Sequence, residues 1–106
     1  MDYKKKIYIS GAITKDPAYR EHFERAEKIL KKEGYIPVNP VKIGEKYVMD
    51  RYEKPEYGDF MRADLRALLD CDGIMFLPSA ADSEGSKVEQ AVAKSLNLLV
   101  VKIKAV

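Results

Sequence analysis

The feature that most constrains the fold is an unbroken apolar run at residues 73–77, which ends at Pro78. A strand with one solvent-exposed face alternates apolar and polar residues, whereas a strand covered on both faces can be apolar throughout. Strands covered on both faces are typical of parallel sheets with helices on either side. The run therefore predicts a buried central strand in an α/β protein.

Strand-like and helix-like segments alternate along the rest of the chain. The strand-like runs are apolar and rich in β-branched or aromatic residues, at residues 7–9, 35–38, 73–77 and 98–103. The helix-like segments repeat apolar residues at helical spacing, at residues 19–30, 57–71 and 88–96. We expect the first helix to begin at Asp16-Pro17 and to stop at Gly34. This order predicts a doubly wound α/β fold of flavodoxin or Rossmann type, with a mainly parallel sheet of four or five strands and helices on both faces.

Residues 41–57 have no clean hydrophobic period. We predict that they form a long surface loop over one end of the sheet, within a single domain that spans residues 1–106. The tyrosines of this segment, Tyr47, Tyr52 and Tyr57, are candidates either for stacking on a base or for packing the loop down.

Composition excludes several classes of protein and site. The net charge is only +2, so the chain has no strong field for a nucleic acid polymer. The single cysteine, Cys71, excludes a disulfide framework and a cysteine-based zinc site, and we expect no metal and no cofactor. We see no signal peptide and no apolar run near the roughly 20 residues of a membrane span. We therefore expect a cytoplasmic protein that does not bind a membrane.

Three acidic residues lie where apolar residues belong. On a helical wheel Asp64 falls inside the core-facing arc of the second helix and Glu89 at the inner edge of the third, while Asp72 precedes the central strand. Burying an unpaired carboxylate costs several kcal/mol, so such residues often mark a site, and we expect these three to converge at one end of the sheet. Each acid also has a structural alternative. Glu89 could complement the helix dipole from the first turn of its helix, and Asp72 could accept hydrogen bonds from nearby backbone amides. Asp64 could form an ion pair with Arg62 or Arg66.

The architecture predicts where a ligand would bind. In open α/β sheets, ligands bind at the carboxyl ends of the strands, which here means residues 10–14, the stretch from Asn39, and residues 78–86. Gly11 and Gly85 either let a ligand approach the backbone or are ordinary turn residues, since the chain has no GxGxxG motif and no P-loop.

Three stretches resemble the nucleoside 2-deoxyribosyltransferase-like superfamily. Residues 8–14 (YISGAIT) are similar to its opening strand and turn. Residues 64–65 and 71–72 are similar to its acidic helix and following strand, and residues 83–89 (SEGSKVE) to its S-x-G-x-x-x-E signature. The resemblance runs from about Tyr8 to Val101 and is closest to a short, uncharacterised branch of the superfamily.

The resemblance implies hydrolysis or transfer at the N-glycosidic bond of a nucleoside or nucleotide. Glu89 would be the nucleophile that forms a glycosyl-enzyme ester, and Asp64 the acid near the leaving base. Tyr8 would hold Glu89 in place, although a strand tyrosine can equally be core packing. The residues expected to bind substrate are Ser10, Gly11, Ile13, Asp72, Ser83, Gly85 and Ser86. Ser83 and Ser86 have a second interpretation as caps of the third helix.

The chain also departs from the characterised relatives. Those that hydrolyse 5′-nucleotides carry Arg and Gly-Gly in the first loop, where this chain has Thr-Lys-Asp-Pro, so Lys15 and Arg20 are the candidates to bind a phosphate. No residue matches the C-terminal carboxamide that larger transferases lend to a neighbouring subunit, which favours hydrolysis or binding alone. The alternative function is a non-catalytic nucleotide-binding module that uses the same pocket. The family also implies a homodimer or a higher homo-oligomer, and we expect His22 and Cys71 to be structural.

Overall fold

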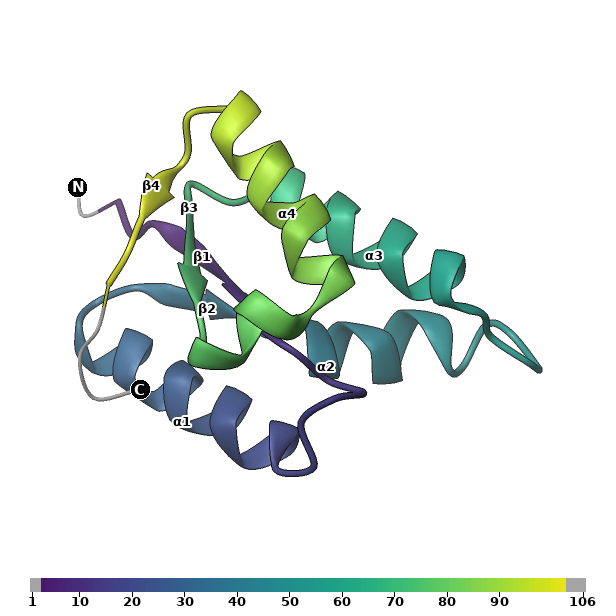
Figure 1. Cartoon of the computed structure of the whole chain (residues 1–106). Coiled ribbons are helices and arrows are strands. Elements are labelled where there is room, and N and C mark those ends of the chain that lie inside the picture. The colour runs from purple at the N-terminus through teal and green to yellow at the C-terminus, as the bar shows by residue number, and fades with distance from the viewer. Residues whose placement is uncertain (1–2, 103–106) are drawn as a thin grey trace.

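A parallel sheet of four strands forms the centre of the structure, a computed structural model that describes residues 3–102 (Figure 1). The strands are β1 (Lys6–Ser10), β2 (Ile36–Val38), β3 (Gly73–Phe76) and β4 (Leu99–Val100). They are hydrogen-bonded in the order β2-β1-β3-β4, and every neighbouring pair is parallel. From β1 the chain first moves outward to β2 and later crosses back to β3. The order therefore reverses between β1 and β3, which opens a crevice at their carboxyl ends.

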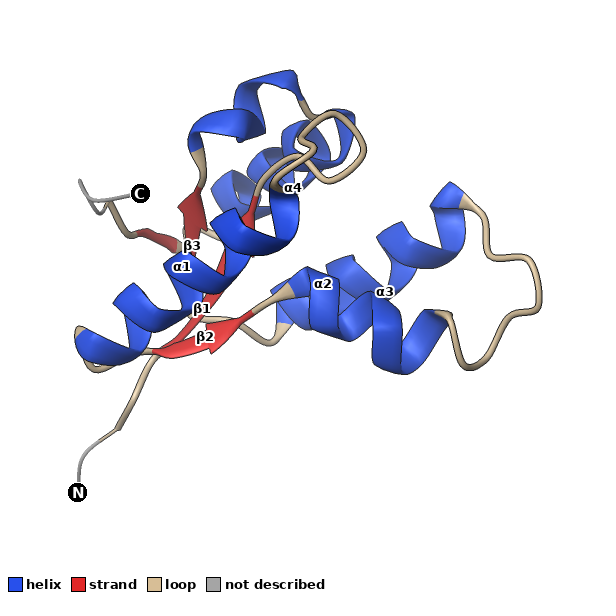
Figure 2. Ribbon diagram, turned by 90° about the horizontal axis from the view of Figure 1, so that it is seen from below, coloured by secondary structure: helices blue, strands red, loops and turns tan. Residues whose placement is uncertain are grey.

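Helices cover both faces of the sheet (Figures 1 and 2). The helical elements of the described residues are α1 (Tyr19–Lys32), α2 (Pro40–Ile43), the π-helical turn η1 (Gly44–Val48), α3 (Tyr57–Leu69), the 3-10 turn η2 (Pro78–Asp82) and α4 (Glu84–Ser95). α1 packs on one face, and α3 and α4 pack on the other. The predicted doubly wound α/β fold with a parallel sheet is confirmed.

Alternation along β1 assigns its side chains to two separate cores. Ile7 and Ile9 point to the α1 side, where they pack with Phe23. Tyr8 points to the opposite side and packs with Leu68 of α3 and with α4. Successive strand residues face opposite ways, so β1 contributes to both cores. Its apolar residues, Ile7, Tyr8 and Ile9, are therefore all buried.

α1 follows the predicted pattern but starts later than expected. Phe23, Ala26 and Leu30 are its buried residues, and the chain leaves the helix through Gly34, whose φ of 90° suits glycine. The helix begins at Tyr19 because Asp16 is engaged in a preceding turn, in which its Oδ1 accepts a hydrogen bond from the backbone N–H of residue 18.

The predicted surface loop at residues 41–57 is wrong over its first half. α2 and η1 occupy residues 40–48 as continuous helical structure. Asn39 is the N-cap of α2, since its Oδ1 accepts a 3.0 Å hydrogen bond from the N–H of Val41, and Pro40 fills the first helical position. Only residues 49–56 remain irregular.

The last strand is shorter and more exposed than predicted. β4 spans only Leu99–Val100, and these two side chains are 42% and 47% exposed, because the strand lies at the sheet edge. Val101 is buried, and Ile103 lies outside the described residues. The predicted central strand is confirmed, with Gly73, Ile74 and Met75 all buried in β3. Within residues 3–102, no helix is long and apolar enough to cross a membrane.

Candidate active site

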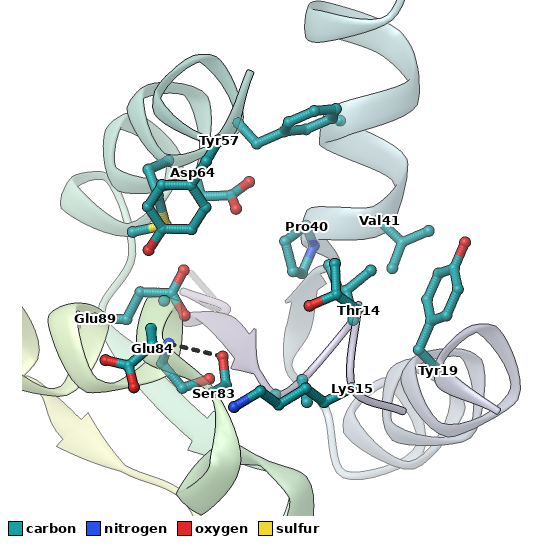
Figure 3. Close-up of a pocket in the computed structure, with 18 of the residues that line it drawn as sticks. Thr14, Lys15, Tyr19, Pro40, Val41, Tyr57, Asp64, Ser83, Glu84 and Glu89 are labelled. Carbon is teal, nitrogen blue, oxygen red and sulfur yellow. Dashed lines mark hydrogen bonds between the residues drawn. The ribbon is translucent and has the colours of Figure 1, made fainter. Parts of the chain in front are cut away.

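A cavity of about 520 Å³ lies at the carboxyl ends of β1 and β3, where the strand order reverses (Figure 3). Its walls come from the loop after β1, the start of α1, the α2–η1 segment, the inner face of α3 and the first turns of α4. This is the position at which doubly wound sheets bind ligands.

Glu89 lies in the wall of this cavity, and two hydroxyls of β1 hold its carboxylate. The side chain belongs to α4 and is only 5% exposed. Tyr8 Oη donates a 2.6 Å hydrogen bond to Glu89 Oε2, and Ser10 Oγ donates a 2.7 Å bond to Oε1. Burial raises the pKa of Glu89, while these two donors act in the opposite direction. Tyr8 and Ser10 can act together because residues two apart on a strand share a face.

Two serines of the α4 segment extend this network. The buried Ser86 hydroxyl is 2.9 Å from Ser10 Oγ, and because Ser10 uses its single proton on Glu89, Ser86 is the donor in that contact. Ser83 caps α4, its Oγ accepting a 3.1 Å hydrogen bond from the N–H of Ser86 (Figure 3). Ser83 also lines the cavity, so the two interpretations of this residue are compatible.

Asp64 brings a second carboxyl group to the same cavity. It lies on the inner face of α3 and is 9% exposed. Its Oδ1 is buried and has no hydrogen-bond partner among the described residues. Burial, and secondly the charge of Glu89, raise the pKa of Asp64 to about 8, so it is protonated at neutral pH. The alternative of an ion pair is not observed, since Arg62 and Arg66 line a different groove.

The remaining wall is largely apolar and partly unforeseen. Tyr57, Phe60 and Met61 of α3 and Pro40 and Val41 of α2 line it. Figure 3 shows Pro40 and Val41 across the cavity from Asp64. The sequence predicted a ligand-binding segment from Asn39 onward but placed it in a loop, although Asn39-Pro40 is the same kind of helix-start signal as Asp16-Pro17. Of the three tyrosines considered for base stacking, only Tyr57 lines this cavity; Tyr47 and Tyr52 line the separate groove.

Most of the residues expected from the sequence meet here. Those that line the cavity are Tyr8, Gly11, Ile13, Asp64, Ser83, Gly85, Ser86 and Glu89. Ser10 is not among the lining residues, but its Oγ donates a hydrogen bond to Glu89 Oε1.

Asp72 does not belong to this group. It stands before β3, at the amino-terminal edge of the sheet, whereas the cavity lies at the carboxyl edge. Its Oδ2 accepts a 2.8 Å hydrogen bond from the N–H of Lys6, and its Oδ1 accepts a 2.7 Å bond from Tyr3 Oη. These donors lower its pKa. The expectation that all three acids converge is therefore wrong for Asp72, which caps backbone as its structural alternative predicted.

Two of the glycines that line the cavity, Gly11 and Gly85, lie close to neighbouring side chains. A Cβ on Gly11 would lie 2.7 Å from Leu77 Cδ1, and one on Gly85 would lie 3.2 Å from Met61 Sδ and 3.7 Å from Tyr57 Oη. The first loop and the start of α4 thus approach their neighbours more closely than a larger residue allows.

Other chemistry at this site has little support. Residues 3–102 contain no group of three or more His, Cys, Asp or Glu placed to hold a metal ion. Cys71 is buried and its thiol contacts the carbonyl of Ala67; burial raises its pKa to about 11, which is typical of an unreactive thiol. Arg20 Nη1 is 2.7 Å from Glu45 Oε1, so of the two candidate phosphate ligands it already has an acidic partner.

A comparison with functionally curated proteins found no match. A family model described as a domain of unknown function, DUF4406, matches residues 5–102. The match spans every strand from β1 to β4 and every cavity residue named above. The chain therefore belongs to the DUF4406 family.

Proposed function

We propose that this protein cleaves the N-glycosidic bond of a nucleoside or nucleotide, with Glu89 as the nucleophile and Asp64 as the acid. The observation that carries the proposal is a pair of buried carboxyl groups in one cavity that differ in their hydrogen bonding: Glu89 accepts bonds from Tyr8 and Ser10, whereas Asp64 Oδ1 has no partner among the described residues. The sequence resemblance to nucleoside 2-deoxyribosyltransferase-like enzymes supports the same assignment.

The two carboxyl groups are suited to different roles. Asp64, with a pKa of about 8, carries a proton at neutral pH and can donate it. Glu89 receives hydrogen bonds on both of its oxygens, which favour the ionised form that a nucleophile needs. Titratable pairs whose environments separate their pKa values are typical of acid and nucleophile assignments.

In the first step, a carboxylate oxygen of Glu89 attacks C1′ of the sugar while the bond from C1′ to the base nitrogen breaks. The electron pair of that bond leaves with the base, and Asp64 gives its proton to the base. The product is an ester between Glu89 and the sugar, together with free base and an Asp64 carboxylate.

In the second step, Asp64 takes a proton from a water molecule as the water oxygen attacks C1′. The ester bond breaks, the free sugar departs and Glu89 regains its charge. We propose water as the acceptor in this step, and release of free sugar together with free base is the product pattern that distinguishes it from transfer to an acceptor base.

The apolar wall supports a planar leaving group. Tyr57, Phe60 and Met61 line one side of the cavity beside Asp64, and aromatic and thioether groups pack well on the faces of bases. The base would then lie next to the acid that protonates it, and the sugar next to Glu89 and Ser83.

Incubation of the purified protein with a panel of nucleosides and 5′-nucleotides, followed by chromatography for free base, tests the proposal. We expect release of base from at least one substrate and its loss in Glu89→Gln. Glu84→Gln is the matched control, since Glu84 lines the same cavity on the same helix but is exposed.

Three outcomes separate the functions. Turnover that survives in Glu89→Gln would rule out the nucleophile assignment. Nucleotide-dependent rise in melting temperature without turnover would support the non-catalytic binding module expected as the alternative. Neither binding nor turnover with any member of the panel would reject both functions.

Two further expectations remain proposals. We propose a homodimer, because a domain of this size gains burial by pairing, and sedimentation analysis of the purified chain tests it. We also propose a cytoplasmic location, which fractionation of the producing cell would check.

A further inference from the structure

A second cavity, of about 390 Å³, lies next to the first. The residues that line it are Lys15, Asp16, His22, Arg25, Leu77, Pro78 and Ser79. It is formed between α1 and the segment that leads into η2, so it occupies the α1 side of the carboxyl edge, while the first cavity occupies the α3 and α4 side.

The charged groups around this second cavity favour an anion. Lys15 makes no ion pair among the described residues, and Arg25 has only an exposed 3.4 Å contact with Glu21, which contributes little and exchanges easily. The acidic residue, Asp16, already accepts hydrogen bonds on both oxygens, from the N–H of residue 18 and from His22 Nδ1 at 2.6 Å. These two contacts occupy the carboxylate oxygens of Asp16, so its hydrogen-bonding capacity is directed to the protein rather than into the cavity.

Ser79 adds a hydroxyl donor to the same cavity. Its Oγ accepts a 3.0 Å hydrogen bond from the N–H of Ala12, which leaves its own proton free to donate to a ligand. A guanidinium, an ammonium and a hydroxyl around one cavity are groups that bind phosphate oxygens well.

The two cavities are connected by shared structure. Lys15 lines both, and the loop after β1 and the segment 78–83 contribute to both. Figure 3 shows the Lys15 side chain extending toward Ser83 at the lower edge of the first cavity. The exposed Asp82 and Glu84 also line the first cavity, so their negative charges disfavour an anion beside them and favour its placement toward Arg25.

We propose that the second cavity binds a pyrophosphate or longer phosphate chain. One part of this proposal rests on the proposed function. In that part, the phosphate groups are the 5′ substituent of a nucleotide whose glycosidic bond lies at Glu89, and Lys15 bridges the two cavities. The substrate class is then a nucleoside 5′-diphosphate or 5′-triphosphate, in preference to a free nucleoside.

Inorganic pyrophosphate tests the cavity itself, independently of any glycosidase activity. Titration followed by amide NMR of the whole chain is expected to shift the resonances of Ser79 and His22 in a saturable way. Arg25→Gln should weaken this binding roughly tenfold, the loss expected for one hydrogen bond to a charged group. Lys28→Gln, which removes one exposed positive charge from the same helix outside the cavity, should change it less than about twofold.

Two results would overturn the site. One is the absence of saturable shifts at millimolar pyrophosphate, and the other is an equal loss of affinity in Arg25→Gln and Lys28→Gln, which would indicate a general charge effect. Unfolding curves of both variants establish that each is folded.

A nucleotide series then tests the link to the first cavity. We expect binding to tighten from nucleoside to 5′-monophosphate to 5′-diphosphate, and the gain from the second phosphate to vanish in Arg25→Gln alone. If pyrophosphate binds but no nucleoside derivative does, the proposed function fails and the phosphate site stands. If nucleosides bind and release free base while added phosphates do not tighten binding, the proposed function stands and this inference fails.

Discussion

Tyr8 and Glu89 are 81 positions apart in the chain, yet their side chains form a 2.6 Å hydrogen bond in the buried interior. Tyr8 has no exposed surface at all. Burial, together with the charge of Glu89, raises the pKa of Tyr8 well above its usual value, so the phenol stays protonated and remains a donor. β1 thereby fixes the orientation of the candidate nucleophile on α4.

Replacing Tyr8 with Phe should weaken both the fold and the site. The substitution keeps the ring that packs against Leu68 but removes a donor from a buried carboxylate. We expect a loss of about 1–3 kcal/mol in the free energy of unfolding, measured by urea titration, and slower base release. Tyr47→Phe, at an exposed tyrosine, is the control and should change neither quantity. Unchanged stability in Tyr8→Phe would show that this bond contributes nothing net.

The raised pKa of Asp64 predicts a specific pH dependence of stability. Between about pH 4 and pH 8 the folded protein keeps the proton of Asp64, whereas the unfolded chain has released it. The free energy of unfolding should therefore fall with rising pH through this window, by up to about 1.4 kcal/mol per pH unit. Base release that depends on the Asp64 proton should fall above about pH 8.

Asp64→Asn isolates this contribution, because asparagine imitates the neutral acid but does not titrate. The difference in unfolding free energy between the variant and the wild-type protein should grow in favour of the variant from pH 4 to pH 8. Parallel curves for the two proteins would mean that Asp64 has an ordinary pKa.

Two glycine substitutions should have opposite effects. In Gly11→Ala the added methyl would lie 2.7 Å from the Leu77 side chain, so we expect a loss of about 1–3 kcal/mol in stability. In Gly58→Ala the methyl meets nothing within 4 Å, and the lower conformational freedom of alanine in α3 should stabilise by up to about 1 kcal/mol. Thermal unfolding of both variants compares them directly, and a neutral Gly11→Ala would contradict the close packing described here.

Removing the cap of α2 should destabilise one wall of the first cavity. Asn39→Ala deletes the acceptor for the N–H of Val41, at a cost of about 0.5–2 kcal/mol. Asn39→Asp keeps an acceptor at the same place and should remain close to wild type. Chemical denaturation measures both, and hydrogen exchange at residues 41–44 should report faster opening in the alanine variant only.

The positions of Asp64 and Glu89 were predictable from the sequence because helical periodicity alone assigns a residue to the buried face. Each carboxylate stood within an apolar arc, and both are buried at the predicted edge of the sheet. The strand pattern likewise predicted β3, since an unbroken apolar run has few alternatives in a small α/β domain.

Placement along the strand axis was harder to predict. Asp72 was grouped with the other acids because it adjoins the same strand, but the beginning of a parallel strand lies at the edge opposite to its end. The helical structure of the α2 wall was not predicted, for a different reason. Residues 40–48 lack a regular apolar period because the segment changes from α to π geometry within nine residues, and each face is too short to repeat.

The alternation of β1 also limits how this protein can change. Inserting or deleting one residue before Tyr8 would exchange the two faces of the strand. An isoleucine side chain would then point toward Glu89, and the phenol would point into the apolar core beneath α1. Length variation is therefore confined to the segments outside this strand. The alternation of these five residues therefore determines both the packing of the two cores and the hydrogen bonds that hold the Glu89 carboxylate.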